Sequence, residues 1–366
     1  MSHRFWVSSG VLAAAMVAVL AVPGFVHAQS NPGVAAKPAT DKSVAKAAAK
    51  PAETAKNWKL PRTPDGVPDL QGYYTNLSFT PMERPAKYAG REFLTDEEVA
   101  KIYKEGVQQS YEFTFNDYGD TPVYDATVYG LSAWQEGVAP NRRSSLVVDP
   151  PDGRIPPLTP EGQKARALAR SAGAKQSYAD PSAAVIANTA QDLNLGERCL
   201  TFGGPPMLPG GYNSNFHIVQ GQGFVEIEYE WGSETRIIPT DGSAHPSSKL
   251  RFWHGDSRGH WEGDTLVVES TNFRPDSTYQ GANADTLKIT ERFTRTDQNT
   301  IDYKFTVEDP TTWTKPWSAV VPFTHQEGPL FEYDCTENNN DAVNILAGAR
   351  AAEREKAMKG TPVSQK

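Results

Sequence analysis

The second half of the chain alternates apolar and polar residues with a period of two. Between 301 and 307 one face of the pattern holds Ile301, Tyr303, Phe305 and Val307, and the other holds Asp302, Lys304 and Thr306. A similar alternation runs from 225 to 231, where glutamates separate Val, Ile, Tyr and Trp. This period predicts half-buried β-strands. Further strands are expected at 236–239, 250–253, 259–262, 265–270, 286–295 and 317–323.

These strands are short and are separated by turn sequences such as Asp241-Gly242 and Gly263-Asp264. Short strands joined by close turns predict an antiparallel meander. A long meander must protect its edge strands, and closure or strong curvature does so. We therefore expect a mainly β fold, an antiparallel meander closing into a barrel or strongly curved sheet, with a few peripheral helices. A β-propeller is the alternative, although no repeat of blade length is visible.

Three helices are expected outside the strands. Thr95 and Glu98 form a capping box at the start of a helix that runs to about residue 109. Thr159 followed by Pro160 predicts the start of a second helix, and residues 341–354 predict a third. The expected organisation is an irregular region over 58–214, with two helices packing on the β domain, and an antiparallel β domain over 215–355 that ends in the C-terminal helix.

The first 57 residues are expected to lie outside this fold. A basic start, an apolar run over 11–22 and the small residues around Ala28 predict that residues 1–28 are a secretory signal peptide. The apolar run is shorter than the roughly 20 residues of a membrane-spanning helix. Residues 29–57 are rich in Ala, Lys and Pro, which predicts a disordered linker. We therefore expect a periplasmic or secreted protein with no membrane span after cleavage.

Composition narrows the classes of partner and cofactor. The net charge is −8 and no basic stripe is present, which argues against nucleic acid binding. No dinucleotide or phosphate-loop motif is present, so no cofactor is predicted, and a divalent metal is kept as an alternative. The two cysteines, Cys199 and Cys335, predict a disulfide in an oxidising compartment, with two separate buried thiols as the alternative. The sequence indicates no oligomeric state.

The densest group of ionisable residues lies between 253 and 264. In it His254 and His260 are candidate bases, Asp256 would orient the base, and Arg258 would stabilise an anion. Trp253 is a candidate ligand-binding residue. His254 and His260 are also the candidate ligands if a metal is bound, although their spacing matches no standard zinc motif. The structural alternative is a hairpin in which Asp256 and Arg258 form a local ion pair.

Glu291 is unusual because it falls on the apolar face of its strand, between Ile289 and Phe293. A buried carboxylate must be paired, protonated or turned towards a polar cavity. Pairing with Arg236 or Arg251 would make it structural. A position facing a barrel interior would raise its pKa and suit it as a catalytic acid or base.

A Gly- and Pro-rich segment at 203–211 precedes the β domain and is expected to form a rigid loop at the rim of a pocket. It lacks the Lys and the helix start of a phosphate loop. Beside it, Asn213, Asn215 and His217 are candidate ligand-binding residues that would point into that pocket.

Several long motifs resemble a large family of secreted bacterial proteins with uncharacterised activity. They are SLVVDPPDGRIPPLTPEG at 145–162, Arg198-Cys199, GDSRGHWEGDTLVVE at 255–269, DPTTWTKPW at 309–317 and EYDC at 332–335. The resemblance covers nearly all of 58–350 and implies export but no reaction. Relatives often carry His and Glu after the last cysteine; here the segment has Thr336 and Glu337, so only the Glu is present.

Together these features predict an exported enzyme that acts on a small organic substrate, aromatic or sugar-derived. It would use His and carboxylate acid–base chemistry as a lyase, isomerase or hydrolase. One alternative is a non-catalytic periplasmic β-barrel that binds an apolar ligand or a cell-wall component. The other is a metal-dependent enzyme that uses the 254–264 group.

Overall fold

The computed structural model describes residues 58–112, 132–173, 188–210, 213–337 and 339–360. The predicted signal peptide and linker lie outside the described residues. Most of the described strands belong to two runs of consecutive antiparallel hairpins. The first run is β3 (Asn215–Gly221), β4 (Phe224–Tyr229) and β5 (Glu234–Pro239). The second run is β6 (Asp256–Glu262), β7 (Thr265–Thr271), β8 (Lys288–Arg295), β9 (Thr300–Glu308) and β10 (Trp317–Gln326).

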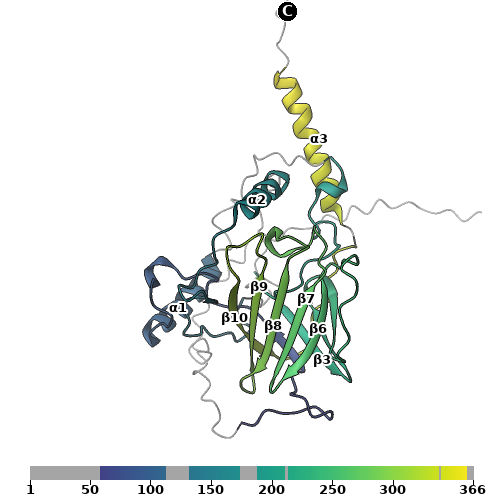
Figure 1. Ribbon diagram of the computed structural model, residues 1–366. Coiled ribbons are helices and arrows are strands. Elements are labelled where there is room, and N and C mark those ends of the chain that lie inside the picture. The colour runs from purple at the N-terminus through teal and green to yellow at the C-terminus, as the bar shows by residue number, and fades with distance from the viewer. Residues whose placement is uncertain (1–57, 113–131, 174–187, 211–212, 338, 361–366) are drawn as a thin grey trace, which may run out of the picture. The chain divides into compact units, whose positions relative to one another are not determined.

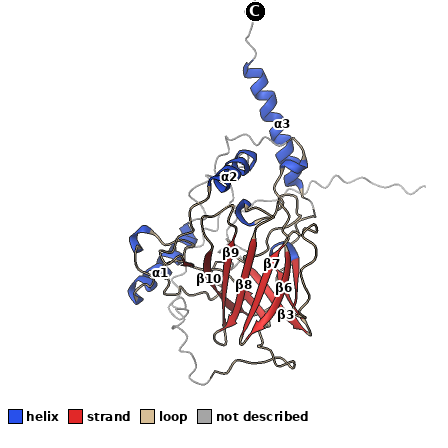
Figure 2. Cartoon of the chain, in the orientation of Figure 1, coloured by secondary structure: helices blue, strands red, loops and turns tan. Residues whose placement is uncertain are grey.

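A short strand from the first half of the chain joins the two runs into one sheet. β1 (Gly72–Thr75) pairs with β3 on one side and with β10 on the other. β2 (Val147–Asp149) pairs with β10. The order is β5-β4-β3-β1-β10-β9-β8-β7-β6, and Figures 1 and 2 show these strands as a single sheet. The mainly β prediction is confirmed, and one continuous sheet differs from the separate blades of a propeller.

The two end strands of the sheet, β5 and β6, face each other without a ladder of backbone hydrogen bonds. Arg236 Nε on β5 donates to Ser257 Oγ on β6 over 2.9 Å. A Cβ on Gly259 of β6 would lie only 3.0 Å from the Ile238 side chain of β5, so the absence of a side chain there permits the close approach. The sheet therefore curves until its edges meet side chain to side chain, but it is not closed into a hydrogen-bonded barrel.

The concave side of the sheet holds an aromatic core. Inward positions of β8, β9 and β10 alternate as the sequence predicts, and the rings of Phe293, Tyr303, Phe305, Trp317 and Phe323 are fully buried. The centroids of the Tyr303 and Phe323 rings lie 4.7 Å apart and the rings are stacked. Because each buried aromatic ring removes a large apolar area from water, this cluster stabilises the curved sheet.

In the described ranges, three α-helices lie outside the sheet (Figure 2): α1 (Asp96–Glu112), α2 (Pro160–Gly173) and α3 (Asn340–Gly360). Thr95 caps α1 as predicted, because its backbone N donates to Glu98 Oε2 over 2.8 Å and its Oγ1 accepts from Glu98 N over 3.3 Å. Short 3-10 turns occur at Ala86–Tyr88, Ala190–Asp192, Trp231–Ser233 and Tyr279–Gly281. Among the described residues, no helix combines the length and the apolar composition that a membrane span requires.

Two sequence expectations change in the structure. Residues 250–253 form no strand: Phe252 makes a single bridge to Phe273, and β6 begins only at Asp256 because Gly255, with φ of 70°, turns the chain first. The sheet also draws β1 and β2 from the region predicted to pack on it from outside. Cys199 and Cys335 form the predicted disulfide.

Candidate functional site

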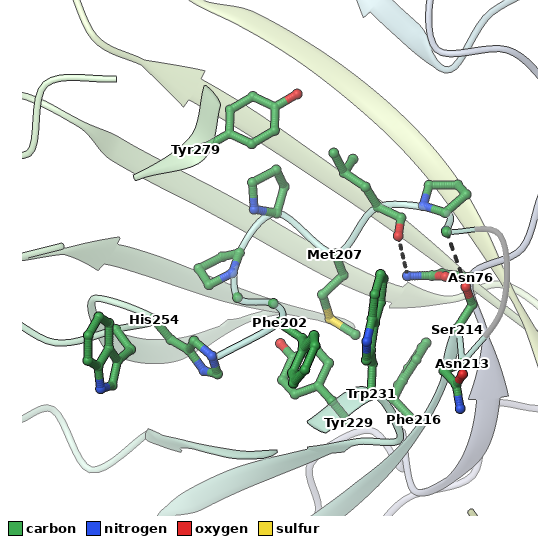
Figure 3. A pocket seen from close by; sticks show the side chains of 18 of the residues that line it. Asn76, Phe202, Met207, Asn213, Ser214, Phe216, Tyr229, Trp231, His254 and Tyr279 are labelled. Atoms are coloured by element: carbon green, nitrogen blue, oxygen red, sulfur yellow. Dashed lines mark hydrogen bonds between the residues drawn. The ribbon is translucent and has the colours of Figure 1, made fainter. Parts of the chain in front are cut away.

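A pocket of about 330 Å³ lies at one end of the curved sheet. Its walls come from the beginning of β3, the end of β4 and the segments before β6 and after β7, which meet at the same end because neighbouring strands are antiparallel. Figure 3 shows its lining. The aromatic members are Phe202, Phe216, Tyr229, Trp231, Trp253, Phe273 and Tyr279. This mixture of aromatic surface and a few polar groups is typical of a small-molecule site.

The predicted rim loop forms one wall of this pocket through residues 203–210. The backbone N of Met207 donates to Tyr303 Oη over 2.9 Å, which fixes the loop to the core of the sheet. Gly204 has φ of 133°, in the region that favours glycine, and a Cβ there would lie 3.1 Å from the His254 ring. The loop can therefore pack directly against His254.

His254 lies in the pocket wall and is held by a carboxylate. Its Nε2 pairs with Glu234 Oε2 and lies 3.0 Å from Thr201 Oγ1. Thr201 Oγ1 donates to Glu234 over 2.9 Å, and Phe202 N donates to the other carboxylate oxygen over 2.8 Å. The side chains of His254 and Glu234 are only 12% and 18% exposed, so solvent screens the pair weakly.

This geometry leaves one nitrogen of the His254 imidazole available to act as a base. With Glu234 ionised, Nε2 carries the proton that the carboxylate accepts, and the lone pair is on Nδ1. Within the described part of the chain, Nδ1 makes no hydrogen bond. A carboxylate that orients a histidine and stabilises its charged form is the arrangement that general bases use.

The other ionisable residues of the 253–264 group lie elsewhere. Alternation along β6 turns Ser257 and Gly259 inwards, so Asp256, Arg258 and His260 point to the outer face. Asp256 accepts two hydrogen bonds of 2.9 Å from Arg258 and pairs with His245 Nδ1 at 2.5 Å.

Only two members of that group, His254 and Trp253, line the pocket. His260 is exposed and lies 3.1 Å from Glu262. The turn at Gly255 is the physical reason for this division, because it separates His254 from the strand that follows.

Of the three residues predicted beside the rim loop, two line the pocket and one does not. Asn213 and Asn215 line the pocket, and Figure 3 shows Asn213 on the side away from His254. His217 does not line it. Its ring stacks on Tyr73, with centroids 4.1 Å apart, and its Nδ1 lies 3.6 Å from Glu228.

Glu291 is fully buried in the core of the sheet and belongs to a paired network. Arg236 donates two hydrogen bonds to its carboxylate, and Tyr303 Oη donates a third over 2.9 Å. Other N–H groups of the Arg236 guanidinium donate to Ser257 Oγ and Ser270 Oγ. Of the two partners expected from the sequence, Arg236 is the one observed; Arg251 pairs with Asp285. Glu291 itself does not line the pocket.

Two carboxyl groups, those of Glu136 and Glu230, lie beside Asn215, which lines the pocket. Burial raises the pKa of Glu136 to about 7, and the nearby carboxylate of Glu230 adds to the rise. Burial likewise raises the pKa of Glu230, against the effect of the amides of Asn215 and Asn213. Both carboxyls therefore hold protons at a higher pH than exposed glutamates do.

Sequence reasoning missed Thr201, Glu234, Glu136 and Glu230. Glu234 follows a turn, and nothing in its sequence neighbourhood indicates that it meets His254. Glu230 continues the alternation of Glu226 and Glu228, which predicted an exposed side chain. The one available signal was the disulfide, since Thr201 lies two residues beyond Cys199.

The predicted metal ligands, His254 and His260, have different partners on different faces. Within the residues that the structure describes, no three His, Cys, Asp or Glu side chains are grouped so as to hold a metal ion.

Comparison of the chain with protein-family models, with curated proteins and with solved structures found no match. The function of the site is therefore inferred from its own geometry.

Proposed function

We propose that this chain is an exported, periplasmic or secreted enzyme that moves a proton on a small, largely apolar organic molecule, aromatic or sugar-derived. The curved sheet works as a barrel filled by its aromatic core, with the substrate bound in the pocket at one end. The observation that carries the proposal is the Glu234–His254 pair in the pocket wall, beside aromatic rings.

In this mechanism His254 Nδ1 accepts a proton from the bound substrate, and Glu234 stabilises the imidazolium that forms. Thr201 positions the pair, because its hydroxyl hydrogen is directed to Glu234 rather than to substrate. The proton then returns to another atom of the substrate or to a leaving group. Such chemistry belongs to isomerases and lyases, and a bound water activated by the same base would make the enzyme a hydrolase.

Exchange of substrate hydrogen with solvent tests this proposal without knowledge of the full reaction. Ligands would first be found by solvent extraction of the purified protein and by quenching of pocket tryptophan fluorescence with phenols and aromatic acids. Each ligand would then be incubated with protein in D₂O and followed by proton NMR. We expect catalysed exchange, reduced about 100-fold or more in His254→Gln, with binding changed only a few-fold.

His260→Gln is the matched control, since it removes a histidine from the outer face of the same segment. It should leave exchange unchanged. Equal exchange in His254→Gln and the natural protein would contradict the proposal.

The second candidate is a non-catalytic protein that binds an apolar ligand or a cell-wall component. The aromatic and proline residues of the lining favour it. It predicts ligand retention and fluorescence quenching with no exchange for any bound compound.

A further inference from the structure

The side chains that line the pocket are neutral, apart from His254. Among the described residues, the polar side chains of the lining other than aromatic ones and His254 are three amides and two serine hydroxyls, and no Lys, Arg, Asp or Glu lines the pocket. The two lining tyrosines are neutral as well, since burial raises the pKa of Tyr229 to about 12 and also raises the pKa of Tyr279. A charged ligand would lose its water here without meeting a counterion in the lining, which is costly.

Two guanidinium groups lie close to aromatic residues of the lining, and both are already paired. Arg274 lies over the Trp253 ring, 4.0 Å from its centroid, and donates two hydrogen bonds of 2.9 Å to Asp276. Arg236 is buried in its pair with Glu291. An anionic ligand would therefore have to compete with a carboxylate of the protein for either cation.

Acidic groups also lie beside the lining, and those described offer little to a cationic ligand. Glu234 already pairs with the His254 imidazole and accepts hydrogen bonds from Thr201 and from a backbone N–H. Burial raises the pKa of Glu136 and Glu230, so both carboxyls resist ionisation. A cationic ligand would in addition face the imidazolium that His254 becomes when it takes up a proton.

We infer, on the basis of this lining and of the proposed proton transfer, that the substrate is an uncharged ring compound whose polar groups are hydroxyl, carbonyl or amide groups. Before the transfer, Glu234 and neutral His254 together carry one negative charge. The proton moves to Nδ1 and the electron pair of the broken bond stays on the substrate, so a monoanion forms beside an imidazolium. An anionic substrate would become a dianion in the same apolar pocket, at a larger electrostatic cost.

Three aromatic ligands of nearly the same shape test this charge preference without any turnover. Near neutral pH benzamide is uncharged, benzoate is an anion and benzamidinium is a cation. In titration calorimetry of the full-length protein, we expect benzamide to bind about 10-fold or more tightly than either ion, because only the ions lose hydration that the lining cannot replace. Equal or tighter binding of benzoate or benzamidinium, or no binding of benzamide, would overturn the inference.

Ser277→Lys places a cation in the lining of the pocket. It should strengthen benzoate binding about 10-fold or more and weaken benzamidinium binding, because the ammonium group is a counterion for one and repels the other. Ser248→Lys, at an exposed serine that does not line the pocket, is the matched control and should change neither affinity. Unchanged benzoate affinity in Ser277→Lys would contradict binding in this pocket.

The charge preference and the proton transfer can fail separately. A preference for benzamide, with no catalysed hydrogen exchange in any bound compound, would support the uncharged ligand class and contradict the proton transfer. Catalysed exchange confined to charged compounds would support the proton transfer and contradict the uncharged substrate.

Discussion

Two buried glutamates, Glu291 of β8 and Glu230 directly after β4, have different kinds of partner. Glu291 is 0% exposed and Glu230 is 1% exposed, so both have lost their water. Glu291 receives hydrogen bonds from Arg236 and Tyr303, whereas only neutral amide groups offset the burial of Glu230. The contrast teaches that burial of a charge does not indicate its role. The charge of the donors around it separates a carboxylate held by a counterion from one whose pKa burial raises.

The two glutamates also looked different in the sequence. Glu291 was conspicuous because it interrupts an apolar face, while Glu230 fits a regular alternation. The sequence contained the partner of Glu291 as well, since Arg236 was one of two candidates. It contained no sign that Glu230 is buried, because that burial depends on how distant segments meet.

The largest expected effect on stability comes from breaking the buried pair of Arg236 and Glu291. Arg236→Met should destabilise the protein by about 3–5 kcal/mol, because it leaves the Glu291 carboxylate buried without its counterion. The double variant Arg236→Met, Glu291→Met should recover most of that loss, since no charge is then left unpaired. Urea unfolding of both variants measures the free energies. A loss below about 1 kcal/mol for the single variant would show that the pair is not the main support of Glu291.

The same comparison shows which parts of the molecule could be predicted. Alternation identified the strands from β7 to β9 closely, because one face of each is buried and a one-residue shift would reverse every side chain. The insertion of β1 between β3 and β10 could not be predicted, since it pairs residues from opposite ends of the chain. In the pocket, the rim loop, His254 and two asparagines were identified from local sequence. Glu234 and Thr201 were not, because they meet His254 only through the fold.

The next effect concerns Glu136, which lies close to Glu230, and the dependence of stability on pH. The folded-state pKa of Glu136, about 7, lies above its ordinary value of 4.5. The folded state therefore binds more protons than the unfolded state between these values, and stability should fall as pH rises from about 4.5 to about 7.

Glu136→Gln should remove this fall, which we expect to be on the order of 2 kcal/mol. Denaturant unfolding at a series of pH values makes the measurement. A parallel pH dependence in the natural protein and the variant would mean that Glu136 is not the titrating group.

The smallest effect on stability should come from the pair of Asp256 and Arg258 on the outer face of the sheet. Arg258 donates two hydrogen bonds to Asp256, as Arg236 does to Glu291, but its side chain is 24% exposed. We expect Arg258→Gln to cost less than about 1 kcal/mol, because solvent screens and replaces the pair. The same urea titration provides the value. A cost as large as that of Arg236→Met would show that geometry outweighs burial in this sheet.

The disulfide between Cys199 and Cys335 closes a covalent ring that contains every strand from β3 to β10. One backbone cut inside this ring leaves both pieces covalently joined. β1 lies outside the ring, yet it occupies the place between β3 and β10. A cut between β1 and Cys199 would therefore leave β1 held by non-covalent contacts alone, as a donated strand that completes the sheet of another chain is held.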